Sequence, residues 1–98
     1  MQQSRKISKA LSDNNRVLIM EMLSQGDKNV SKVAEDLNVE ENLASHHLRV
    51  LSAAGFLQST KKGREVYYSI HKKKLINIIK TLKKNPIFYE ILAEAIKD

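Results

Sequence analysis

Residues 40–55 read EENLASHHLRVLSAAG, and this stretch decides how the rest of the chain is interpreted. Its apolar side chains recur with the period of an α-helix, about 3.6 residues, at Leu43, Val50, Leu51 and Ala54, with Leu48 on their flank. The polar positions between them carry neutral or basic hydrogen-bonding groups: Asn42, Ser45, His46 and Arg49. The pattern predicts a helix over 41–54 that Gly55 ends in the left-handed conformation. Its polar front suits the major groove of DNA, and an ordinary surface helix is the alternative.

The composition describes a small globular chain. It has 98 residues, of which 42% are hydrophobic and 29% charged, so we expect one domain over 1–98 rather than a disordered segment. No apolar run approaches the roughly 18–20 residues of a membrane span, and the N-terminal MQQSRK lacks the apolar core of a signal peptide. The absence of cysteine excludes disulfides and thiolate metal sites. We therefore expect a cytoplasmic protein.

The net charge of +6 is unevenly distributed along the chain. Residues 1–54 hold seven Lys or Arg and seven Asp or Glu, whereas residues 55–98 hold ten and four. An excess of this kind favours a polyanionic partner, of which nucleic acid is the simplest. The competing polyanion is an anionic membrane surface, which the apolar stripe over 75–82 and its flanking lysines would contact.

The segments before residue 40 predict three helices. A short helix is expected over 3–11, and a second over 14–23 with Ser12-Asp13 as its N-cap. A third is expected over 30–37, capped by Asn29. The connection over 38–40 is so short that the third helix and the 41–54 helix together form a helix-turn-helix.

After Gly55 the pattern changes to that of a β-hairpin. Residues 56–60 and 65–70 are rich in strand-forming side chains, and a cationic turn separates them. The turn, 61–64, contains a glycine and these three cations: Lys61, Lys62 and Arg64. A solvated basic turn is the alternative, but directly after a helix-turn-helix the same hairpin is interpreted as a wing that reaches phosphates or a minor groove.

The remainder, 72–97, is helical, and Asn85-Pro86 interrupts it. Asparagine as a cap with proline at the first helical position predicts a second helix, and a single kinked helix is the alternative. This tail has more aliphatic surface than a small winged helix covers, so we expect 3–11 and 72–97 to form a two-fold dimer interface. A tail folded back on its own domain is the other reading. The residues expected in the interface are Ile7, Leu11, Leu75, Ile78, Ile79 and Leu82.

Four segments, in this order, resemble the ArsR/SmtB family of winged-helix repressors: ALSDNNR (10–16), VAEDLNV (33–39), SHHLRVLSAAGFL (45–57) and KKGREVYYSI (61–70). The resemblance implies a mainly α fold with a small β-hairpin. The implied architecture is a winged helix-turn-helix, with four helices, two strands and then one or two further helices. It also implies a homodimer that binds an imperfect palindrome at a promoter and represses transcription until a signal releases it.

Several positions depart from the family pattern. Where the family favours Ser-Gln-Ser at the start of the 41–54 helix, this chain has Glu40, Glu41 and Asn42. The family's metal-binding thiolates align with Asn29 and Ser31, which are not soft ligands. Its other common metal site aligns with Lys72, Lys74, Asn85 and Phe88. Because lysines repel a cation, we expect no metal site and no cofactor.

The resemblance and the polar pattern together predict the contacts with double-stranded DNA. We expect the major groove to be read by Asn42, Ser45, His46 and Arg49, with Arg49 the best candidate for guanine or a phosphate. The DNA backbone is expected to be held by His47, Lys61, Lys62 and Arg64. His47 matches a position that the family commonly fills with histidine, for packing or for a phosphate contact. Three alternatives stay open for the signal: an unidentified small molecule between the subunits, a partner protein, or nothing but the protein's own concentration.

Other chemistries have less support. His46 and His47 are adjacent, so on a helix they point about 100° apart and cannot chelate one ion together. We find no nucleophile paired with a base, no phosphate-binding glycine loop and no acid pair, so we expect no enzyme. The functional alternative is a winged-helix module that binds another protein and retains only vestigial DNA contact.

Overall fold

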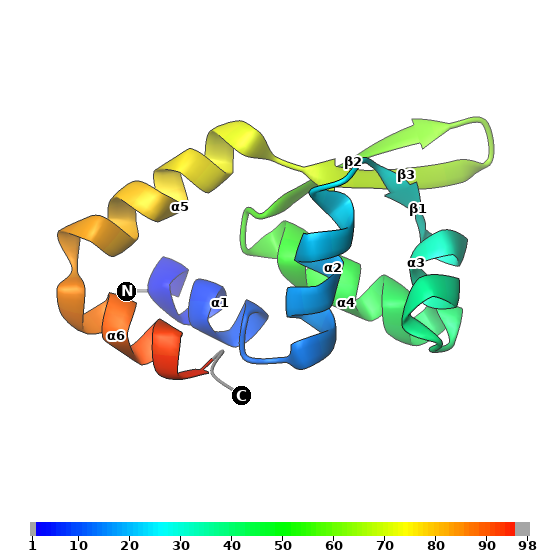
Figure 1. Ribbon diagram of the computed structural model, residues 1–98. Coiled ribbons are helices and arrows are strands. Elements are labelled where there is room, and N and C mark those ends of the chain that lie inside the picture. The colour runs from blue at the N-terminus through cyan, green and yellow to red at the C-terminus, as the bar shows by residue number, and fades with distance from the viewer. Residues whose placement is uncertain (1, 96–98) are drawn as a thin grey trace.

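The computed structural model describes the backbone of residues 2–95 and the side chains of 5–87, 90, 93 and 94. The elements are α1 (Gln2–Ala10), α2 (Asn14–Leu23), β1 (Lys28–Asn29), α3 (Val30–Leu37), α4 (Glu41–Ala53), β2 (Leu57–Lys62), β3 (Glu65–Ile70), α5 (Lys72–Lys84) and α6 (Pro86–Ala95). Figure 1 shows the hairpin of β2 and β3 projecting beyond the helices at one end of the molecule. From the base of β3, α5 runs back towards the other end, and α6 then lies beside α1.

The helices α2 and α3 begin at the caps that the sequence predicts. The Asp13 carboxylate accepts hydrogen bonds from the backbone N–H groups of Asn15 at 2.8 Å and Arg16 at 3.3 Å. The Asn29 side-chain oxygen accepts from the N–H of Lys32 at 2.8 Å. These bonds satisfy donors that a helix start otherwise leaves unpaired, which is why the predicted spans 14–23 and 30–37 are confirmed.

The turn of the helix-turn-helix depends on one left-handed residue. Asn38 has φ 57°, a conformation that asparagine tolerates better than most residues, and the N–H of Val39 donates to the carbonyl of Ala34 at 3.0 Å. The same arrangement ends α4, as predicted. Gly55 has φ 93°, and the N–H of Phe56 donates to the carbonyl of Leu51 at 3.0 Å. Backbone hydrogen bonds therefore fix the path of the chain in two places, at the end of α3 just before α4 and at the end of α4 itself.

The buried face of α4 agrees with the predicted stripe at Leu51 and Ala54, and at the flanking Leu48, and differs from it at the other two positions. The inward positions are Ala44, His47, Leu48 and Leu51. Leu43, which the period assigned to the back of the helix, is 43% exposed, and Val50 is only half-buried. The helix is rotated because Ala44 is small enough to allow close packing and because His47, although polar, has a hydrogen-bond partner inside the domain.

That partner is Arg16, a cation only 8% exposed. Its Nε donates to the carbonyl oxygen of Ala10 at 2.7 Å, and its Nη2 donates to that of Lys9 at 3.1 Å. Its Nη1 lies 3.1 Å from Nδ1 of His47. One guanidinium therefore caps the C-terminal end of α1, where the helix dipole favours a cation, and joins α1 and α2 to α4. Sequence patterning did not identify Arg16 as a buried residue.

The sheet contains a strand that the sequence did not predict. β1 pairs antiparallel with β3, placing Lys28 opposite Tyr68, so the strand order is β1-β3-β2. A two-residue strand is too short to show an alternating pattern, which is why it was missed. In the hairpin, Lys62 pairs with Glu65, so the turn is only Gly63-Arg64 and the predicted turn over 61–64 was too long. Gly63 has φ 63°, which a tight hairpin turn of this type requires.

The C-terminal region forms two helices, which decides between the two readings of Asn85-Pro86. Asn85 has an extended backbone, φ −131°, and Pro86 opens α6. Residues 96–98, including the end of the predicted span 72–97, lie outside the described residues.

Two residues expected in the dimer interface belong instead to the protein's own core: Ile7 is 0% and Ile78 2% exposed. Their burial follows from the way α1 and α5 flank the end of α4.

We predict that Arg16→Ala lowers the free energy of unfolding by about 3 kcal/mol, because it leaves the carbonyls of Lys9 and Ala10 and the Nδ1 of His47 without their donor. Urea denaturation followed by circular dichroism, at fixed protein concentration, measures the change. Arg5→Ala, at an exposed cation on α1, is the matched control. Equal, small losses in the two variants would contradict the anchoring role of Arg16.

Candidate nucleic-acid interface

The outward face of α4 carries the polar residues that the sequence singled out. Asn42, His46 and Arg49 are exposed, and Ser45 is half-buried. Nη1 of Arg49 donates to the hydroxyl oxygen of Ser45 at 2.6 Å, one helical turn away. This bond holds the guanidinium along the helix while leaving its other donors available. Because Leu48 and Leu51 lie on the opposite, buried side, this face can meet a ligand without disturbing the core.

The first turn of α4 is tied to α3. The Ser31 hydroxyl donates a hydrogen bond to a carboxylate oxygen of Glu41. Glu40 occupies the N-cap position and makes no side-chain capping bond, although its charge complements the positive end of the helix dipole. The sequence left the purpose of these two carboxylates open. The structure gives Glu41 a bond between the two helices of the helix-turn-helix.

The hairpin presents its cations in two different ways. Lys61, Lys62 and Arg64 are all exposed. The Lys62 ammonium lies 3.3 Å from a carboxylate oxygen of Asp27 and 4.7 Å from the centroid of the Tyr67 ring. Lys62 therefore ties β2 to the loop after α2. Within the described part of the chain, the side chains of Lys61 and Arg64 form no ion pair or hydrogen bond.

The tip of the hairpin lies next to the start of the helix-turn-helix. Arg64 lines a groove of about 250 Å³ together with Asn29, Val30 and Ser31 at the beginning of α3. Since Ser31 also bonds Glu41, the hairpin tip, α3 and the first turn of α4 meet at one end of the molecule. The structure thus brings Arg64 close to the helix-turn-helix, as a wing requires.

The cations of α3 and β1 are used internally. Lys28 lies 3.0 Å from Asp36, and Lys32 lies 3.2 Å from the same carboxyl group. The hydrogen bonds from Lys28 and Lys32 lower the pKa of Asp36, and the bond to Asp36 raises the pKa of Lys32. These exposed pairs neutralise the surface of α3. The unpaired positive charge near this end is therefore left to Arg49, Lys61 and Arg64.

His47 does not lie where a phosphate contact needs it. Its side chain is 4% exposed, and its Nδ1 faces the Arg16 guanidinium. Of the two roles considered for this residue, packing and phosphate contact, the burial fits packing. An arginine can only donate, so Nδ1 is the acceptor and His47 is neutral. Burial lowers the pKa of His47, and the charges of Arg16 and His46 lower it further, against an opposing effect of Asp13.

The histidines have structural partners rather than a shared ligand. The rings of His46 and His47 are 5.9 Å apart and tilted by 51°. His71 caps α5, because its Nδ1 accepts from the N–H of Lys74 at 3.3 Å. Among the residues that the structure describes, no group of three or more His, Cys, Asp or Glu side chains could hold a metal ion. No helix within 2–95 is long and apolar enough to cross a membrane.

The known proteins that this chain resembles are described as regulatory proteins of transcription. Residues 13–59, from the cap of α2 into β2, match the family model described as bacterial regulatory protein, arsR family. The chain is 35% identical over 65 residues to the transcriptional repressor SdpR of Bacillus subtilis, covering 66% of this chain and 72% of that protein. It is 43% identical over 75 residues to a CadC homolog of Staphylococcus aureus, a cadmium resistance transcriptional regulatory protein. That match covers 72% of this chain and 62% of the relative.

A solved structure shares the fold. The homodimeric winged helix-turn-helix DNA-binding domain Mb0332 from Mycobacterium bovis superposes with a TM-score of 0.71 at 24% identity. The match covers 85% of this chain and 80% of that one. It extends the similarity beyond the segment that the family model matches. The order of helices and strands predicted from the sequence is therefore confirmed, with β1 as an addition.

We predict that acidification weakens the fold through His47. Burial lowers the pKa of the folded-state His47 below its ordinary value of 6.5, so the unfolded chain binds more protons between the two values. The contribution of His47 is complete above pH 6.5 and is lost as the pH falls through the lowered pKa. Urea denaturation at a series of pH values measures this slope.

His47→Gln should flatten the slope below pH 6.5, since it removes the titrating group. His46→Gln, at the exposed neighbour, is the control and should keep it. If His47→Gln retained the full slope, the acid sensitivity would come from other groups.

Proposed function

This chain belongs to the arsR family of bacterial regulatory proteins, and from that premise we propose that it is a homodimeric transcriptional repressor that binds operator DNA. The observation that carries the proposal is the face of α4, where Asn42, His46 and Arg49 are exposed on a helix whose back is locked by Leu48, Leu51 and the Arg16–His47 bond. A recognition helix needs this combination, because its side chains must meet base edges from a fixed position.

The proposed contacts follow from which side chains are free. Asn42, Ser45, His46 and Arg49 enter the major groove, where Ser45 orients the Arg49 guanidinium towards guanine or a phosphate. Lys61 and Arg64 contact the DNA backbone, with Lys62 contributing less because Asp27 partly neutralises it. His47 positions α4 from within the core and does not touch DNA. Glu41 is bonded to Ser31, which holds its charge beside α3.

The proposed dimer uses the exposed apolar face of α5. Ile76 is 54% and Ile79 44% exposed, while Leu11, Leu75 and Leu82 are half-buried. Exposed isoleucines along one helix are costly in water and favour a second copy. The fold neighbour from Mycobacterium bovis is described as homodimeric, which supports this arrangement. A two-fold dimer would place its two α4 helices about 34 Å apart, one turn of DNA.

We do not extend the cadmium response of the Staphylococcus aureus relative to this chain. Cadmium is a soft ion that prefers thiolate ligands, and the sequence contains no cysteine. We also assign no catalytic role, because the family consists of transcriptional regulators. The proposal therefore includes no response to cadmium.

We predict that Arg49→Ala weakens binding to DNA selected from a random pool by the wild-type protein, by about ten- to a hundredfold, because a bidentate base contact is lost. Arg64→Ala should weaken binding more uniformly across sequences and reduce the salt slope by about one. Fluorescence anisotropy at several salt concentrations separates the two effects.

Lys84→Ala, at an exposed position at the end of α5 and off the face of Ile76 and Ile79, removes the same charge away from the proposed DNA contacts and serves as the control. A wild-type protein that dimerises but selects no DNA would overturn the repressor proposal in favour of a protein-interaction module. Loss of affinity to the same extent in all three variants would indicate bulk charge rather than these contacts.

We predict that Ile79→Asp shifts the protein towards monomer, because a carboxylate would be buried without a partner in the proposed interface. Analytical ultracentrifugation gives the dissociation constant of the dimer. Leu18→Asp is a close control, since Leu18 on α2 is 45% exposed against 44% for Ile79 and lies outside the proposed interface. Equal effects of the two substitutions would contradict the role of α5.

A further inference from the structure

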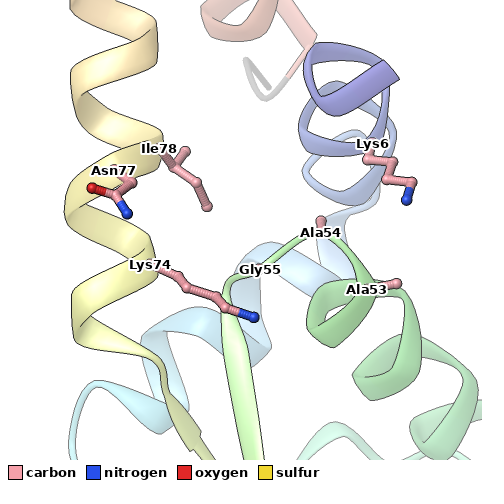
Figure 2. A pocket seen from close by; sticks show the side chains of 7 residues that line it. All are labelled: Lys6, Ala53, Ala54, Gly55, Lys74, Asn77 and Ile78. Atoms are coloured by element: carbon pink, nitrogen blue, oxygen red, sulfur yellow. The ribbon is translucent and has the colours of Figure 1, made fainter. Parts of the chain in front are cut away.

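A cavity of about 510 Å³ lies where α1, the end of α4 and α5 approach one another (Figure 2). The proposed DNA contacts do not use it. Its polar lining consists of Lys6 from α1 and Lys74 and Asn77 from α5. Its apolar lining consists of Ala53, Ala54, Gly55 and Ile78. Two cations and no carboxylate therefore share one cavity, whose size falls within the roughly 300–1,000 Å³ of small-molecule sites.

The apolar side of this cavity is fixed in the core. Ile78 is 2% and Ala54 6% exposed, and Figure 2 shows Ile78 pointing from α5 into the space between the helices. The backbone at Gly55 lies close to α5. A Cβ placed on Gly55 would lie 3.7 Å from Cδ1 of Ile78 and 3.8 Å from Cδ of Lys74. The cavity thus offers a rigid apolar wall beneath its two ammonium groups.

The ammonium groups of Lys6 and Lys74 do not help to hold the described part of the fold together. Figure 2 shows the Lys74 side chain crossing from α5 towards Gly55, and Lys6 extending from α1 near the end of α4. Neither side chain forms an ion pair or a hydrogen bond in the part of the chain that the structure describes. By contrast, Lys28, Lys32 and Lys62 are each paired with a carboxylate.

Capping of α4 does not explain these lysines either. A helix C-terminus attracts cations because its last carbonyls are unpaired. Here the carbonyls of Val50, Leu51 and Ser52 already accept from the N–H groups of the residues that follow α4. The positive charge of the cavity is therefore available to a molecule from outside the chain.

We propose that this cavity binds a small organic anion and is the effector site of the repressor. A carboxylate or phosphate group pairs with the ammonium groups of Lys6 and Lys74 at the mouth of the cavity, which Asn77 also lines. The apolar part of the ligand packs on Ile78 and Ala54. The ligand-binding part of this inference stands on the cavity alone, and its regulatory part rests on the proposed DNA-binding function.

The location of the cavity connects a ligand to DNA binding. Among the described side chains of α5, Ile78 is fully buried, and Leu75 and Leu82 are half-buried against the core. The position of α5 relative to the rest of the domain therefore depends on side chains at and beside the cavity. An anion that draws Lys74 and Lys6 together would change the angle between α5, in the proposed dimer interface, and α4, which faces DNA. The spacing of the two α4 helices in a dimer depends on that angle. An anion that binds better to the DNA-free arrangement must release the operator.

The test of binding uses benzoate as the probe and benzamide as its neutral match, each titrated into the full-length protein without DNA and followed by ¹⁵N NMR. We expect benzoate to shift the backbone resonances of Ala54 and Gly55 and the side-chain amide of Asn77. Benzamide should bind at least about tenfold more weakly, because it lacks the charge that both lysines recognise. Equal responses to the two probes, or shifts elsewhere only, would overturn the proposal.

Substitution of single lysines tests which ammonium groups bind the benzoate carboxylate. Lys74→Gln and Lys6→Gln should each weaken benzoate binding by about five- to tenfold, since each removes one charge-assisted contact. Lys73→Gln, at an exposed neighbour on α5 that does not line the cavity, should leave the affinity unchanged. A loss of affinity in Lys73→Gln equal to that in Lys74→Gln would mean that benzoate responds to the general charge of α5.

The regulatory part has its own measurement. If benzoate weakens operator binding by some factor, the operator must weaken benzoate binding by the same factor. Benzoate that binds the cavity without changing operator affinity would overturn the effector role and leave the binding site intact. A protein that binds benzoate but no DNA would overturn the proposed repressor function and not the cavity.

Discussion

The buried guanidinium of Arg16 is the interaction on which the position of α4 depends. It donates to the last carbonyls of α1 and faces His47 in the middle of α4, so three helices are joined at one cation. Its charge is tolerated inside because each of its three nitrogens has an acceptor: the carbonyls of Ala10 and Lys9 and the Nδ1 of His47. The same contact requires a neutral His47. The orientation of the polar side of α4, which we propose faces DNA, thus follows from a hydrogen bond on its opposite side.

Local signals in the sequence were sufficient for most of the fold. Asp13, Asn29 and Gly55 act on their immediate neighbours, so the ends of α2, α3 and α4 could be located without knowing what packs on them. The rotation of α4 about its axis could not be predicted in this way. It depends on the contact between His47 and Arg16, which are 31 residues apart in the sequence. For the same reason burial removed His47 from the expected DNA contacts and Ile7 and Ile78 from the expected dimer interface.

The excess positive charge has a more specific distribution than its total suggests. Ion pairs with Asp27 and Asp36 occupy Lys28, Lys32 and Lys62, which the count of charges alone does not separate from the rest. Many of the other cations form no ion pair in the described part of the chain, including Lys73 and Lys83 on α5, and two groups of them lie at the candidate sites. Arg49, Lys61 and Arg64 lie with the helix-turn-helix and the hairpin, and Lys6 and Lys74 lie at the cavity beside α5. Each group has the charge for an anionic ligand, but they serve separate surfaces.

The two-residue strand β1 has a wider consequence. It pairs with β3 and runs directly into α3, while Ser31 at the start of α3 bonds Glu41 on α4. The wing, α3 and α4 therefore form one continuous hydrogen-bonded unit, to which α5 is joined through the apolar side chains of Leu75, Ile78 and Leu82. This arrangement places the residues proposed to contact DNA and the residues proposed to bind the anion on different elements. In the proposed scheme, substitutions around the cavity can change the ligand that is bound without altering the side chains of α4 that are proposed to face DNA.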